Sequence, residues 1–113
     1  MRMLKIGGAA FVVIAVGIVQ DATARGNAET GKAKAAQVCA ACHGADGAKP
    51  SAPDQPILAG QYYEYLIKAL SDYKSGKRND PVMKGFAAGL SRKDMEDLAA
   101  WFASQKSSLH FQR

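Results

Sequence analysis

Apolar and polar residues follow two different patterns along this chain. Residues 6–19 form an uncharged, mostly apolar run near the N-terminus. From residue 28 onwards, apolar side chains recur at intervals of three and four, the spacing of one face of an α-helix. No segment shows the pattern of a strand–helix–strand unit. The sequence therefore predicts an all-α domain that follows an apolar leader.

A first helix is predicted over residues 28–41. Asn27 can cap its N-terminus, and Glu29 places a negative charge in its first turn. Its small side chains would let a neighbouring helix approach closely. These are Ala33, Ala36, Val38 and Ala40. Gly44 and Gly47 break the chain after this helix.

Residues 60–75 show the clearest helical period. Aromatic and aliphatic side chains share one broad face of this predicted helix. They are Tyr62, Tyr65, Leu66, Ala69, Leu70 and Tyr73. Gly76 stands at the stop position. The preceding residues, 49–59, contain three prolines and are therefore predicted to form a loop.

Residues 77–89 are predicted to form a loop with at most a short helix. Asp80 can cap such a helix, and Pro81 fits its first turn. Met83 lies within this segment, outside any strong periodic stripe.

A last helix is predicted from Ser91 to about residue 105. Ser91 is its expected N-cap, Asp94 lies three residues on, and Leu90 with Met95 can form a hydrophobic staple. Apolar residues then continue at helical spacing as far as Phe102. Residues 106–113 are predicted to form a polar, flexible tail.

The N-terminal run has the features of an export signal. Positive charge comes first, the apolar run of residues 6–19 follows, and Ala22-Thr23-Ala24 is a small-residue cleavage site. The alternative is an uncleaved anchor, but a membrane-spanning helix needs about 20 apolar residues. We therefore expect residues 1–24 to be a cleaved signal peptide, residues 25–113 to be the working domain, and the protein to be periplasmic.

Composition adds two exclusions. A hydrophobic content of 48% is too high for a disordered chain. The net charge is +5, but the basic residues are scattered among acidic ones and form no nucleic-acid-binding arm. We expect a solvated, mildly basic surface or, alternatively, a basic rim that attracts an acidic redox partner.

The residues with the clearest chemical function form one short motif, Cys39-Ala40-Ala41-Cys42-His43. Two thiols three positions apart, followed directly by a histidine, form the attachment pattern of a c-type haem. The thiols can become thioethers on the porphyrin vinyl groups, and His43 can then ligate the iron. Metal-bound histidines usually donate their second ring N–H to an oxygen, and we expect the carbonyl of Pro56 to accept it.

Two other interpretations of the cysteine pair are weaker. A thioredoxin-like site places its thiols after a strand, whereas residues 29–38 are rich in Ala and Lys and show no strand pattern. A structural zinc site needs four ligands, and the sequence offers only the two cysteines, His43 and the distant His110.

An electron-transfer haem also needs a ligand on its second face. Three residues are candidates: Met83, Met95 and His110. Met95 lies in the apolar period of the last helix, which favours a packing role. His110 belongs to the predicted tail. We therefore expect Met83 to be the sixth ligand; His/Met ligation raises the reduction potential relative to bis-His ligation.

Four sequence segments together resemble class I cytochromes c. They are CAACHG at residues 39–44, PILAGQ at 56–61, GKR at 76–78 and NDPVM at 79–83. The resemblance covers nearly all of residues 27–104. It is closest to the small, soluble, monohaem bacterial periplasmic type and is similar to one half of the dihaem class I cytochromes.

The resemblance implies a cytochrome c fold. Three to five helices would wrap around one covalently attached haem, with the N- and C-terminal helices crossing. It implies covalent attachment at Cys39 and Cys42 and axial ligation by His43 and Met83. The further haem environment that it implies consists of Pro56, Tyr65, Leu66, Leu70 and Arg78, of which Pro56 orients the histidine and Arg78 faces a propionate.

The implied function is one-electron transport without a substrate, so we do not expect an enzyme. The expected partners are redox proteins, such as a membrane oxidoreductase or a terminal oxidase of a respiratory chain, and the expected state is a monomer that binds no nucleic acid. The sequence contains one C-x-x-C-H motif, which predicts one haem. The alternative is a haem-containing subunit, or a ligand-binding haem protein or enzyme with a labile sixth ligand.

Overall fold

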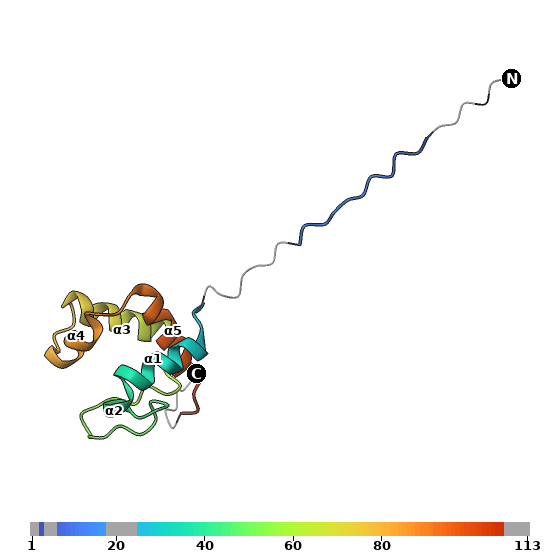
Figure 1. The fold of residues 1–113 in the computed structure, drawn as a ribbon. Helices are drawn as coiled ribbons and strands as arrows, with labels where there is room; N and C mark the ends of the chain where they lie inside the picture. Colours follow the sequence, from blue (N-terminus) through green and yellow to red (C-terminus); the bar gives the residue numbers. More distant parts are fainter. Residues whose placement is uncertain (1–2, 4–6, 18–24, 108–113) are drawn as a thin grey trace, which may run out of the picture.

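A computed structural model describes residue 3 and residues 7–17 and 25–107 of the chain. Within these ranges the chain forms five helices and no strand (Figure 1). The helices are α1 (Ala28–Val38), α2 (Ala40–His43), α3 (Tyr63–Ser75), α4 (Pro81–Ala87) and α5 (Arg92–Ala103). The predicted all-α class is therefore confirmed.

Residues 7–17 form neither a helix nor a strand and extend away from the helices in Figure 1. Their apolar side chains are exposed; Phe11, for example, is 91% exposed. No helix among the described residues is long and apolar enough to cross a membrane. The predicted cleavage site at residues 22–24 and the positions of Arg2 and Lys5 lie outside the described residues, so the export signal stays a prediction.

The first predicted helix is interrupted at Cys39. Asn27 caps α1 as expected, because its side chain accepts a hydrogen bond of 2.9 Å from the backbone N–H of Thr30. The predicted continuation to residue 41 is wrong, since Cys39 departs from helical geometry with φ −113° and α2 begins after it. Backbone bonds still cross the break, from Cys39 N–H to Ala35 O and from His43 N–H to Cys39 O. The chain therefore reaches His43 through a second, four-residue helix.

The first and last helices pack closely, with Gly31 at their crossing. A Cβ atom on Gly31 would lie 1.9 Å from the carbonyl oxygen of Asp97, so no larger residue fits there. Ala35 is fully buried one turn later. The prediction that Ala33 and Ala36 form the packing face was wrong, since both are exposed. Residues four apart share a helix face, which places residues 31 and 35 together on the side opposite these alanines.

A buried carboxylate joins the same two helices. Asp97 of α5 is 2% exposed, and one of its oxygens accepts a 2.7 Å hydrogen bond from the backbone N–H of Asn27. Its other oxygen accepts one from Lys93 Nζ, also at 2.7 Å. Both oxygens are therefore satisfied, as a buried charge requires.

The middle helix buries a narrower face than its sequence pattern suggested. α3 begins at Tyr63 rather than at residue 60, and it ends as predicted at Gly76, whose φ is +81°. Its buried residues are Leu66, Ile67 and Tyr73, whereas Tyr62 and Tyr65 are 57% and 47% exposed. Ile67 lies outside the predicted stripe.

The last two helices begin as the sequence predicts. Asp80 caps α4, which is a seven-residue helix with Pro81 in its first turn. Ser91 and Asp94 form a reciprocal capping box at the start of α5. α5 ends at Ala103, two residues before the predicted end. α5 packs on α1 and α3, and α4 packs chiefly on α3, so the core lies among α1, α3 and α5.

Candidate functional site

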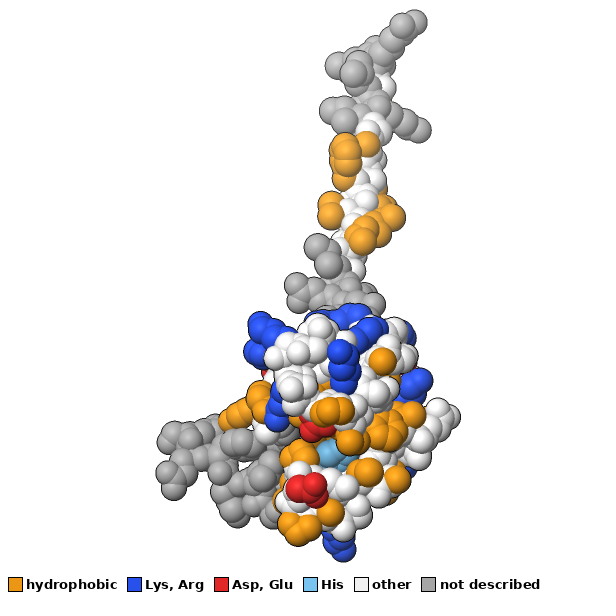
Figure 2. Space-filling model, turned by 90° about the vertical axis from the view of Figure 1, so that its left-hand side faces the viewer, with side chains coloured by type: hydrophobic (Ala, Val, Ile, Leu, Met, Phe, Trp, Pro, Cys, Tyr) orange, Lys and Arg blue, Asp and Glu red, His pale blue; other side chains and the backbone are white. Residues whose placement is uncertain are grey.

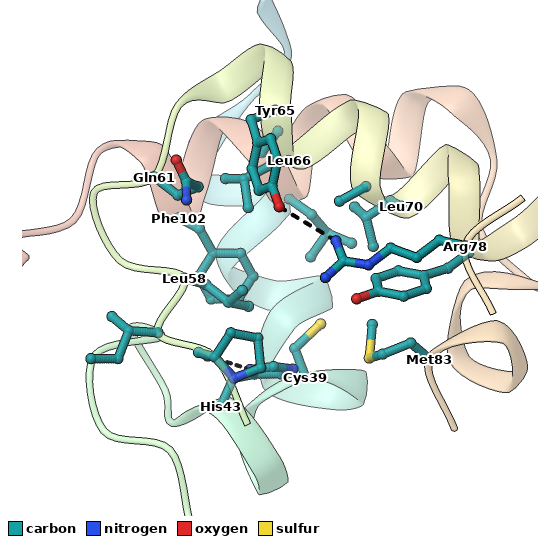
Figure 3. Close-up of a pocket in the computed structure, with 16 residues that line it drawn as sticks. Cys39, His43, Leu58, Gln61, Tyr65, Leu66, Leu70, Arg78, Met83 and Phe102 are labelled. Atoms are coloured by element: carbon teal, nitrogen blue, oxygen red, sulfur yellow. Dashed lines mark hydrogen bonds between the residues drawn. The ribbon is translucent and has the colours of Figure 1, made fainter. Parts of the chain in front are cut away.

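Two adjoining cavities lie beside α2, α3 and α4. They contain about 780 and 840 Å³ of empty space, including their open mouths. The first is lined by eight of the nine predicted site residues: Cys39, His43, Pro56, Tyr65, Leu66, Leu70, Arg78 and Met83. The ninth, Cys42, lines the second cavity. The fold therefore brings all nine to two adjoining cavities, of which Figure 3 shows the first.

His43 is the best-fixed side chain of this site. It is 6% exposed, and its Nδ1 lies 2.9 Å from the carbonyl oxygen of Pro56. A carbonyl oxygen can only accept a hydrogen bond, so Nδ1 carries a proton, and in the neutral imidazole Nε2 then has the free lone pair. The predicted hydrogen bond is present, and it prepares the histidine to bind a metal through Nε2. Figure 2 shows the histidine in a hollow with a largely hydrophobic rim.

The loop that presents the Pro56 carbonyl is fixed at both ends. Ser51 N–H donates to the carbonyl of Cys42 at 2.9 Å, and Leu58 N–H donates to that of Gly47 at the same distance. Gly47 has a φ of +77°, and a Cβ there would lie 2.8 Å from the ring of Phe102. The loop is therefore attached both to the end of α2 and to α5, and His43 is oriented by a fixed carbonyl.

The two cysteines are half-buried and not joined to each other. Burial raises the pKa of Cys39 from its ordinary value of 9.0 to about 11, although the charge of Lys34 acts in the opposite direction. Thiol–disulfide enzymes depend on a cysteine with a lowered pKa. The environment of Cys39 thus argues against a disulfide oxidoreductase.

Met83 lines both cavities, but it comes from a helix rather than a loop. It is the third residue of α4, and in Figure 3 its sulfur points into the pocket. Met95 belongs to the core, is 3% exposed and lines neither cavity; its sulfur lies 3.5 Å from the hydroxyl of Ser71. His110 lies outside the described residues. Met83 is therefore the one methionine between residues 25 and 107 that lines the cavity wall.

Arg78 is the one charged side chain among the residues that line the first cavity. Its guanidinium lies 4.7 Å from the ring centroid of Tyr73 and donates to the hydroxyl of Tyr65 at 3.4 Å (Figure 3). Burial raises the pKa of Tyr73, and the nearby Arg78 partly opposes this. The arginine is thus held at the edge of an otherwise uncharged pocket, where it can meet an anionic group.

Several lining residues were not predicted as part of the site. The first cavity is also lined by Ile57, Leu58, Gln61, Ala69, Leu98, Ala99 and Phe102, and the second by Val82, Phe86 and Leu90 among others. The helical period of the last helix indicated that Leu98 and Phe102 are buried, but it could not separate packing against protein from packing against a ligand.

The chemistry of the lining fits a c-type haem. Apolar side chains match the faces of a flat macrocycle, an imidazole and a thioether match the axial positions of iron, and two cysteines match the vinyl groups. Arg78 matches the carboxylate of a propionate. The macrocycle faces, the two axial positions, the two vinyl groups and one of the two propionates therefore have counterparts among the residues present.

Comparison with known proteins agrees with this fit. The family model Cytochrome c matches residues 28–106. The chain belongs to the cytochrome c family. With Cys39 and Cys42 in its attachment motif, it carries one covalently bound haem c.

The matched region is a larger share of this chain than of the individual relatives. Cytochrome c4 of Pseudomonas aeruginosa is 50% identical over 98 residues, which are 87% of this chain and 48% of that protein. The thiosulfate dehydrogenase electron acceptor of Stutzerimonas stutzeri is 46% identical over 66 residues, 58% of this chain and 31% of that protein. The crystal structure of reduced recombinant cytochrome c4 from Pseudomonas stutzeri superimposes with a TM-score of 0.67 at 45% identity, covering 74% of this chain and 48% of that one. The chain thus spans about half the length of the cytochromes c4, or less.

Proposed function

We propose that this chain is a one-electron carrier in which His43 and Met83 ligate the iron of a covalently bound haem. The observation that carries the proposal is the state of His43: its Nδ1 is engaged by Pro56, so Nε2 is free, and Met83 lines the same cavity from a separate helix. When bound, the haem supplies an iron that alternates between the ferrous and ferric states. Two protein ligands leave no coordination position for a substrate.

The other site residues hold the cofactor in this proposal. Cys39 and Cys42 bind it covalently, and the carbonyl of Pro56 keeps the imidazole in one orientation. Leu66 and Leu70 exclude water from one face, which favours the less charged ferrous state. Tyr65 and Arg78 bind a propionate at the edge of the cavity.

We further propose that the carrier works in the periplasm and exchanges electrons with other redox proteins. The N-terminal sequence supports export, as described above.

The electron-acceptor name of the Stutzerimonas stutzeri relative supports a partner enzyme that delivers electrons, while a membrane oxidoreductase or terminal oxidase would receive them. Val82 and Phe86 are 64% and 48% exposed and line the second cavity together with Cys42, so a partner could approach the haem edge there. Short-lived redox contacts of this kind bury less than about 1,200 Å².

The ligand set is tested by replacing Met83 with Ala in the purified holoprotein. Ligation of ferric iron by a methionine sulfur gives a far-red absorption band, which we expect in the wild type and expect to be lost completely in Met83→Ala. The reduction potential should fall as well, because the thioether ligand favours the ferrous state. Met95→Leu is the matched control: it exchanges the buried methionine for a residue of similar volume and should keep the band.

The competing function is a haem protein that binds an external ligand. It predicts a wild-type protein without the methionine band that binds carbon monoxide readily in the ferrous state. Either the absence of the band or its survival in Met83→Ala would exclude the proposed ligand pair.

A further inference from the structure

The N-terminus of α4 is held by one carboxylate oxygen. Oδ1 of Asp80 accepts hydrogen bonds from the backbone N–H groups of Val82 and Met83, each 3.0 Å long. Asp80 itself is extended, with φ −139° and ψ 108°, and Pro81 occupies the first helical position. One of the two bonds is made to the very residue whose sulfur faces the cavity. The backbone of Met83 is thus tied directly to Asp80.

Further attachments of α4 lie toward its other end. Ala87 is fully buried and Leu90 is 4% exposed, and the carbonyl of Leu90 accepts a 2.5 Å hydrogen bond from Lys74 of α3. The outward face of α4 carries Val82 and Phe86, both exposed. A seven-residue helix is too short to persist without such anchors. Its first turn is therefore held by the Asp80 cap and by the half-buried Met83 side chain, which packs against the core, while its last turn is anchored by the fully buried Ala87.

We propose that Asp80 is a positioning residue for the sixth ligand: by capping α4, it keeps the backbone of Met83 where the sulfur can reach the iron. This rests on the proposed ligation by Met83. Without the cap, the first turn of α4 loosens and the fraction of molecules with Met83 detached rises. An external ligand for the ferric iron can bind only to those molecules, so its apparent affinity rises by the same factor.

The test is a titration of the ferric holoprotein with imidazole, followed through the methionine–iron band. Loss of an N-cap weakens a helix end enough to change an equilibrium by about 2- to 30-fold. We therefore expect Asp80→Ala to bind imidazole about 2- to 30-fold more tightly than the wild type. Asp80→Asn removes the charge but keeps an oxygen acceptor that is as good an N-cap, and we expect its affinity to stay within about twofold of the wild type.

Asn27→Ala is the matched control, because it removes the N-cap of α1, away from Met83. It should lower the melting temperature without changing the affinity for imidazole. The proposal is overturned if Asp80→Ala binds imidazole like the wild type, if Asn27→Ala tightens binding as much as Asp80→Ala does, or if Asp80→Asn does so, which would point to charge rather than capping. A wild type without the methionine band would instead refute the ligation itself, so the two failures are distinguishable.

Discussion

Residues 39–59, which carry His43, and residues 77–90, which carry Met83, contribute to the same cavity but are attached to the domain differently. The His43 segment is held together internally by backbone hydrogen bonds and by the Nδ1 bond to Pro56. It is joined to the helices beside it by the bond from Cys39 N–H to Ala35 O and by the close contact of Gly47 with Phe102. The Met83 segment packs chiefly on one helix and exposes apolar side chains. One proposed iron ligand, His43, is buried in the closely packed part of the domain, and the other, Met83, is carried by a short helix that packs chiefly on α3.

Because of this difference, we expect substitutions in the two segments to change different measured properties. Changes around His43 and the crossing of α1 with α5 should act on global stability, because they disturb the packed core. Changes around Met83 should act on ligand exchange and reduction potential, because α4 packs chiefly on α3 and takes little part in the core among α1, α3 and α5. Local opening of a sparsely packed element generally costs less free energy than global unfolding.

The largest expected effect follows from losing the cofactor attachment. With Cys39 and Cys42 both replaced by Ser, we expect no bound haem and no cooperative melt of far-UV circular dichroism, because the cavity walls would lose the apolar body that they pack against. Residues 39–59 and residues 77–90 would then no longer differ in how firmly they are held. Ala41→Ser, an exposed position between the two cysteines, is the control and should keep the haem and the melt. A sharp cooperative transition in the double variant would show that the core folds without haem.

A pair of identical substitutions contrasts the two regions directly. Gly31→Ala should lower the free energy of unfolding by about 1–3 kcal/mol, because its Cβ would lie 1.9 Å from the carbonyl oxygen of Asp97. Gly85→Ala, in the middle of α4, would place a Cβ with nothing within 4 Å of it apart from its chain neighbours and the backbone of its own helix, and should instead stabilise that helix by about 0.5–1 kcal/mol. Denaturant unfolding measures the effect of Gly31→Ala. The affinity of the ferric holoprotein for imidazole measures the effect of Gly85→Ala and should fall as α4 becomes more stable. Equal effects of the two substitutions would contradict the contrast between a closely packed crossing and an open short helix.

The smallest expected effect concerns charge at the edge of the cavity. Arg78→Gln should lower the reduction potential by about 40 mV, or about 1 kcal/mol, because a propionate would lose its counter-charge and ferric iron would be favoured. Lys77→Gln changes the net charge equally at the adjacent exposed position, which does not line the cavity, and should have a smaller effect. Potentiometric titration compares the two. The same shift in both variants would mean that Arg78 acts only through net charge.

Local rules predicted much of the fold and of the site. The caps at Asn27, Asp80 and Ser91 follow from side chains that accept hydrogen bonds from neighbouring backbone groups, and all three are present. The bond from His43 to Pro56 could be anticipated because a ligand histidine needs an acceptor and a proline-rich loop follows it.

The features that sequence did not predict depend on contacts between distant segments. Nothing local distinguishes Gly31 from Ala33 as the crossing point of two helices; the difference is the carbonyl of Asp97, which lies on another helix. The break at Cys39 has no glycine or proline to mark it. Ile57 and Leu58 line the cavity because of how the loop after Gly47 is folded back, and no periodicity describes a loop.

The bond between the Asp97 carboxylate and the backbone of Asn27 joins residues 70 positions apart. Contacts at such separation form late, because the chain must first close a long loop and lose the corresponding entropy. A ribosome makes α1 before α5, so the newly made N-terminal part cannot complete its core until α5 has been synthesised. The order of the helices along the chain thereby delays folding of this domain until its last helix is available.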